Sequence, residues 1–65
     1  MTFGEKVSYV RAKMLLTQTQ LAQELGVSLA TIARWETQNR KPQMVQYGKF
    51  LKFCEKYKIT FEDEK

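Results

Sequence analysis

Histidine is absent from this 65-residue sequence, and cysteine occurs only once, at Cys54. A single thiol cannot form an internal disulfide, which is typical of a protein from a reducing cytoplasm. Without imidazole, the chain cannot build a Ser-His-Asp triad, a Cys/His pair or a Cys/His metal site. No pair of carboxylates stands in a context that would form a cleft, so we predict a protein that is not an enzyme and uses no metal or cofactor.

Long apolar runs are also lacking, because none approaches the ~18 residues of a membrane span. The chain does not open with the charged and then apolar pattern of a signal peptide. Three glycines and one proline are too few for a disordered segment. We therefore expect one domain over residues 1–65, with a small core, since a chain this short buries only ~60% of its unfolded surface.

Positive charge dominates the chain, with a net charge of +4. Three of the seven acidic residues lie together at 62–64, and residues 1–61 hold ten basic and four acidic side chains, a net charge of +6. A small basic body favours a polyanionic partner. By itself the signal is weak, because many basic surfaces are only solvated.

The spacing of apolar residues predicts helices, and no alternating pattern lasts long enough to predict a strand. A first helix is expected up to residue 14 and a second from residue 17. Thr2 with Glu5, and Thr17 with Gln20, have the spacing of a capping box, in which each member satisfies a free N–H group of the other. The buried faces should comprise Phe3, Val7, Val10, Met14, Leu21, Ala22 and Leu25.

Gly26 interrupts what otherwise reads as one helix from Leu21 to Glu36. Glycine most easily adopts the left-handed conformation that ends a helix, and Ser28 can then begin another over residues 29–37. Ile32 and Trp35 fall on the inward side of that third helix, and Ser28 lies with them. Two short helices joined by a turn containing glycine form a helix-turn-helix.

A fourth helix is expected from about Gln43 to Tyr57, with Pro42 suited to its first turn. One apolar line comprises Met44, Tyr47, Leu51 and Cys54, and a second comprises Phe50, Phe53 and Tyr57. The second line is either extra core or a surface for self-association. Thr60 and Asp63 have the spacing to cap a fifth helix, which we expect to be incomplete.

Residues 18–42, QTQLAQELGVSLATIARWETQNRKP, resemble the Cro/CI-type (Xre family) helix-turn-helix of phage repressors and bacterial regulators. Seven residues match the small, glycine and apolar positions of that motif, namely Leu21, Ala22, Leu25, Gly26, Val27, Ile32 and Trp35. The family often has glycine where Gln38 stands, so the third helix is expected to end differently, through Asn39. The resemblance implies an all-α, compact four- to five-helix lambda-repressor-like domain, with residues 18–37 as its helix-turn-helix.

On a helix over residues 28–37, the face opposite Ile32 and Trp35 carries small residues and one long cation, Arg34. Such a face can enter the major groove, where arginine pairs with guanine and apolar side chains contact thymine methyl groups. We predict base contacts from Leu29, Ala30 and Arg34. The alternatives are that Leu29 and Ala30 only pack and that Arg34 is a solvated charge.

Contacts with the DNA backbone are expected at the two edges of the motif. A phosphate can bind the free N–H groups where the second helix begins, and basic residues follow the third helix. The predicted backbone-contacting residues are Gln18, Ser28, Thr31, Asn39, Arg40 and Lys41. The resemblance also implies an interior ion pair between Arg11 and Glu36, the alternative being two exposed, unrelated charges.

These observations predict sequence-specific binding of double-stranded DNA by a transcriptional regulator, most often a repressor in the family. A homodimer would bind half-sites about one helical turn apart. The expected location is the cytoplasm of a bacterium or of a phage-infected bacterial host. The alternative function is an antitoxin or adaptor that docks a partner protein through the fourth helix, because a fold does not determine a function.

Overall fold

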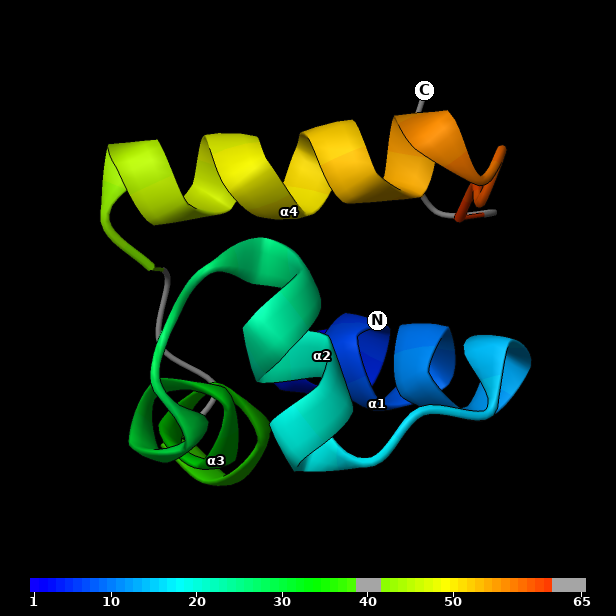
Figure 1. Cartoon of the computed structure of the whole chain (residues 1–65). Coiled ribbons are helices and arrows are strands. Elements are labelled where there is room, and N and C mark those ends of the chain that lie inside the picture. The colour runs from blue at the N-terminus through cyan, green and yellow to red at the C-terminus, as the bar shows by residue number, and fades with distance from the viewer. Residues whose placement is uncertain (39–41, 62–65) are drawn as a thin grey trace.

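The computed structural model describes residues 1–38 and 42–61, which form four helices and no strand (Figure 1). The helices are α1 (Phe3–Met14), α2 (Gln18–Leu25), α3 (Leu29–Gln38) and α4 (Met44–Lys56). In Figure 1, α4 lies across the top, α3 lies below the end at which α4 begins, α2 lies in the centre, and α1 runs from the centre to the right below α4. The predicted all-α fold is confirmed.

Capping boxes begin the first two helices, as the sequence predicts. The Thr2 hydroxyl accepts from the Glu5 N–H at 3.2 Å, and the Glu5 carboxylate accepts from the Thr2 N–H at 2.8 Å. Thr17 and Gln20 repeat the arrangement at 3.0 and 2.8 Å. Each box satisfies two of the N–H groups that a helix leaves without an internal acceptor.

Three of the helices end in the same way, with a residue in the left-handed conformation. These residues are Leu15 after α1, Gly26 after α2 and Lys58 after α4, with φ of 57°, 69° and 56°. The next amide then donates to a carbonyl five residues earlier, in the pairs Leu16–Arg11, Val27–Ala22 and Ile59–Cys54. The residue that donates is apolar each time, which suits a helix end that turns back onto the core. Only Gly26 was expected from the sequence.

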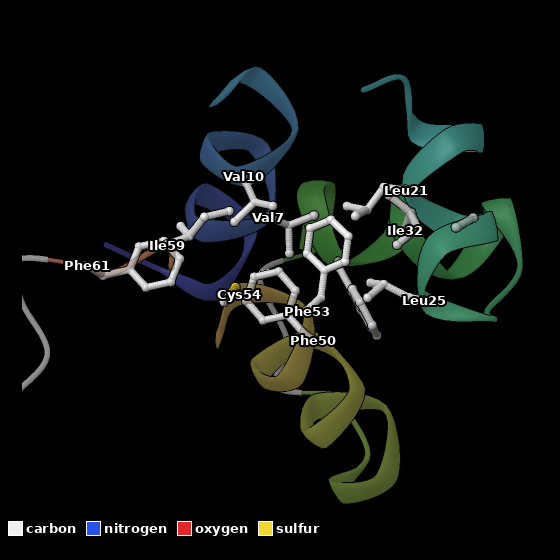
Figure 2. Packing of buried hydrophobic residues seen from close by; sticks show 12 residues of the cluster. Val7, Val10, Leu21, Leu25, Ile32, Phe50, Phe53, Cys54, Ile59 and Phe61 are labelled. Carbon is white, nitrogen blue, oxygen red and sulfur yellow. The ribbon is translucent and has the colours of Figure 1, made fainter. Parts of the chain in front are cut away.

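The core collects side chains from all four helices and from the segment after α4 (Figure 2). Val7, Val10, Leu21, Ile32 and Phe50 are fully buried. Most predicted core residues of the first three helices are confirmed, with Phe3 and Met14 only partly buried. Ile59 and Phe61 also belong to the core, which the sequence did not predict.

The expected bounds of the fourth helix are confirmed within one residue at each end, but two other expectations for it are wrong. Pro42 precedes the first turn and does not lie in it. Met44 and Leu51 are exposed, because the helix turns the side of Phe50, Phe53 and Cys54 to the core.

Phe50 and Phe53 are buried in the core, so they cannot form a self-association or docking surface, and extra core is the correct interpretation for them. Thr60 and Phe61 lie outside any helix, and Asp63 lies outside the described residues. Among the helices of the described part, none has the length and apolar character needed to cross a membrane.

Candidate nucleic-acid interface

The orientation of α3 is fixed by its two buried residues. Ile32 is fully buried and Trp35 is 5% exposed. The Trp35 ring meets the edges of Phe3 at 5.2 Å and Phe50 at 6.5 Å between ring centroids. Because α1 and α4 hold the tryptophan from two sides, the opposite face of α3 is held toward solvent. Trp35 is a core residue, as predicted.

The outward face of α3 carries little bulk and one positive charge. Leu29, Ala30, Arg34 and Thr37 are exposed, while Thr31 is half-buried. The Thr37 hydroxyl donates to the Ala33 carbonyl at 2.8 Å, so that side chain is directed back along the helix. Arg34 is therefore the one long side chain of this face that can reach into a groove.

Ser28 caps the start of α3 from the exposed side. Its hydroxyl accepts from the Thr31 N–H at 3.1 Å, and the two hydroxyls lie 2.9 Å apart. The capping role was predicted, but the inward position was wrong, because Ser28 is exposed. The two hydroxyls form one polar group beside Leu29.

The start of α2 offers backbone donors next to this surface. Thr17 and Gln20 use their own N–H groups in the capping box. The N–H groups of Gln18 and Thr19 belong to the first turn, where a helix has no internal acceptor for them. The start of α2 also carries the positive end of the helix dipole. The start of α2 can therefore bind an anion.

Glu36 joins three helices through its carboxylate. Arg11 donates from Nε to Oε2 at 2.6 Å and from Nη2 to Oε1 at 3.0 Å. Gln18 donates from Nε2 to Oε1 at 3.0 Å. The side chains of Arg11 and Glu36 are 26% and 9% exposed, so the pair lies at the edge of the core rather than deep inside.

The same network holds the charge on Glu36. Burial acts to raise the pKa of its carboxyl, but hydrogen bonds from Arg11, Gln18 and Ser8 and the charge of Arg11 outweigh it, so the pKa lies below its ordinary value. The hydrogen bond to Glu36 likewise raises the pKa of Arg11 against the effect of burial. Both groups are charged at neutral pH, and the contact is a bidentate ion pair.

Two separate hollows border these groups. The first joins the turn before α2 to the start of α3, and the second lies between the outward face of α3 and the start of α4. Leu16, Gln18, Thr19 and Leu29 line the first hollow. Thr31, Arg34 and Gln38 line the second. Asn39, Arg40 and Lys41, predicted to contact the backbone, lie outside the described residues.

Sequence reasoning missed two features of this surface. The hydrogen bond between Gln18 and Glu36 joins residues 18 positions apart, and no local pattern could have shown it. Thr19 lies beside Gln18 in the first hollow. The position of Thr19 in the first turn of a capped helix was the available signal for it.

Comparison with known proteins identifies the class to which this arrangement belongs. A family model described as helix-turn-helix matches residues 7–62. The chain therefore belongs to the helix-turn-helix family, whose members are DNA-binding domains that regulate transcription. Within that class it is of the Cro/CI (Xre) type.

A curated relative is the HTH-type transcriptional activator BcrR of Enterococcus faecalis, which is 35% identical over 63 residues. The alignment covers 97% of this chain and 29% of the relative, so the chain spans less than a third of that protein's length. No solved structure matches the chain. In the described residues no group of three or more Cys, Asp or Glu side chains is placed to hold a metal ion.

Proposed function

We propose that this domain binds a specific double-stranded DNA sequence by inserting α3 into the major groove. The observation that carries the proposal is the outward face of α3, where Arg34 stands among small side chains while Trp35 fixes the opposite face in the core. The major groove is wide enough for one helix, and it alone distinguishes all four base pairs. A flat face with one long donor suits that groove.

Three residues carry the base contacts in this proposal. Arg34 donates two hydrogen bonds to O6 and N7 of a guanine, the commonest specific contact of arginine. Leu29, which is 48% exposed, and Ala30 contact thymine methyl groups. Since few polar side chains take part, sequence-dependent DNA shape supplies the rest of the specificity.

The backbone contacts of the proposal surround this face. Gln18 keeps its second Nε2 hydrogen after it has donated to Glu36, so its amide can donate to a phosphate while Glu36 orients it. Ser28 and Thr31 offer hydroxyls at the start of α3. Asn39, Arg40 and Lys41 supply the other edge. These contacts fix the register of the protein on the duplex and carry no sequence information themselves.

We further propose that residues 1–65 act as one domain in the cytoplasm and that two copies bind half-sites about one helical turn apart. The domain would act by binding and not by catalysis. Occlusion of a promoter would make it a repressor, the commonest role implied by the resemblance. The relative from Enterococcus faecalis is named an activator, and the same docking can serve either role according to where the operator lies.

Selection of bound duplexes from a random pool tests the proposal directly. We expect a short consensus that contains a guanine under Arg34, repeated in two-fold symmetry about one helical turn away. The affinity for the selected duplex should exceed the affinity for unselected duplexes by at least about 10³-fold. Equal binding to every duplex in the pool would contradict specific recognition.

A further inference from the structure

Gly48 lies inside α4 in ordinary helical conformation, unlike Gly26, whose φ is positive. A methyl group at Gly48 would meet no other atom of the described residues within 4 Å. Glycine weakens a helix relative to alanine, because it leaves the unfolded chain more freedom to lose. Nothing in the fold of one copy therefore requires glycine at this position.

Exposed apolar side chains lie on either side of Gly48 along the helix. Met44, one turn earlier, is 88% exposed, and Leu51, one turn later, is 41% exposed. We call Met44, Gly48 and Leu51 the Gly48 stripe. Its spacing of four and then three residues is that of the contact line between two packed helices. Val45 borders the stripe and is 71% exposed.

We propose that the Gly48 stripe is a homodimer contact in which α4 packs in parallel against α4 of a second copy. The direction of packing rests on the proposed function. Figure 1 shows α3 below the end at which α4 begins. A two-fold axis along α4 therefore puts both α3 helices at the same end of the pair, as one duplex requires, whereas antiparallel packing puts them at opposite ends.

The residues of the stripe suit a second copy of this chain better than an unrelated partner. On a two-fold axis each residue meets its own copy, so it must be small or apolar. Gly48 lets the two backbones approach closely, and Met44 and Leu51 meet apolar copies of themselves.

The contact is small, which determines how it works. A helix of 13 residues is about 20 Å long, and three side chains along it bury less than the ~1,200 Å² of a stable interface. The pair therefore forms weakly in solution. It becomes effective when one duplex holds two copies side by side, because the second contact is then intramolecular.

Sedimentation equilibrium of the 65-residue chain without DNA, at concentrations up to about 1 mM, tests the contact. We expect a reversible monomer–dimer equilibrium that Gly48→Ala weakens at least tenfold. In dilute solution the same substitution should raise the midpoint of thermal unfolding by about 2–8 °C, because the monomer has room for the methyl group. A substitution that weakens association while it stabilises the monomer cannot act by damaging the fold.

Lys49→Ala is the matched control, because Lys49 lies on the other flank of α4 beside Gly26 and should leave association unchanged. A wild-type chain that stays monomeric at 1 mM would overturn the proposal, and so would undiminished association of Gly48→Ala.

Oxidative cross-linking tests the parallel direction. Met44→Cys should form a disulfide-linked dimer readily, since a parallel pair brings the two exposed positions together, whereas Lys49→Cys should not. Cys54 is buried and should leave the wild-type chain uncross-linked under the same conditions. Equal cross-linking of the two variants would overturn the parallel arrangement.

The dimer contact and the proposed function can be disproved independently of each other. Gly48→Ala should bind a duplex with one half-site as tightly as the wild type and lose only the cooperative gain on two half-sites. Dimerisation of a chain that binds no duplex would contradict the proposed function and still support the contact.

Discussion

Glu36 accepts hydrogen bonds from two other helices, from Arg11 on α1 and from Gln18 on α2. Glu36 therefore fixes the end of α3 to α1 and α2. It also orients the side-chain amide of Gln18, which we expect to bind a phosphate. Because desolvation offsets much of the attraction within such a pair, its main contribution is geometry. The loss of one partner leaves the other charge without compensation.

Arg11→Met should lower the free energy of unfolding by about 1–3 kcal/mol, less than for a fully buried pair because Arg11 is partly exposed. Urea unfolding at neutral pH measures the change. Lys13→Met on the same helix is the control, because Lys13 is exposed, and it should change stability by less than about 0.5 kcal/mol. Equal losses in both variants would mean that the ion pair contributes nothing specific.

The contribution of Glu36 should depend on pH in a definite direction. Its pKa is lower in the folded chain than its ordinary value, so the charged carboxylate stabilises the fold above the pKa of the unfolded chain, about 4.3. That contribution is lost as the pH falls through the folded pKa. The wild type should therefore exceed Glu36→Gln in stability most clearly above pH 5, and the difference should shrink below about pH 4. Urea unfolding at several pH values checks this, and a difference independent of pH would contradict it.

At the scale of the helices, Gly26 at the end of α2 and Gly48 within α4 should have opposite effects on stability when replaced by alanine. Gly26 has a φ of +69°, which alanine adopts only with strain, and a methyl group there would come no nearer than 3.9 Å to another residue, the Lys49 ammonium. Gly26→Ala should lower the free energy of unfolding by about 1–2 kcal/mol through the backbone alone. Gly48→Ala should raise it by about 0.5–1 kcal/mol. Thermal unfolding of the dilute monomers compares them, and a loss in both would contradict this account.

The sequence could predict the elements whose cause is local. Capping boxes act within four residues, and Gly26 stands between two apolar helical patterns, where glycine favours a helix end. The pair Ile32 and Trp35 follows from helical periodicity within one element. These features positioned the helix-turn-helix correctly.

Other elements depend on the tertiary structure. Leu15 and Lys58 adopt left-handed conformations because the apolar residues after them, Leu16 and Ile59, turn back toward the core. In α4, apolar residues occur on nearly every side, so periodicity alone could not decide whether Met44 or Phe50 faces inward. The link between Gln18 and Glu36 needed the packing of α2 against α3.

At the scale of the whole molecule, the positive charge should act on DNA mainly through phosphates. The logarithm of the association constant should fall linearly with the logarithm of salt concentration. Lys41→Gln should weaken binding to all duplexes alike and make that slope shallower by about one, as expected for the loss of one phosphate contact. Fluorescence anisotropy across a salt series measures the slope, and an unchanged slope would remove Lys41 from the proposed interface.

The affinity of Arg34→Ala for the selected duplex tests the central claim most directly. The account predicts a loss of about 10- to 100-fold on that duplex, a much smaller loss on unselected duplexes, and relaxed preference at the guanine under Arg34. Lys52→Ala removes a charge of α4 that lines neither hollow of the proposed interface, so it should bind the selected duplex like the wild type. An equal loss of affinity on all duplexes, or no loss on the selected one, would contradict recognition by the outward face of α3.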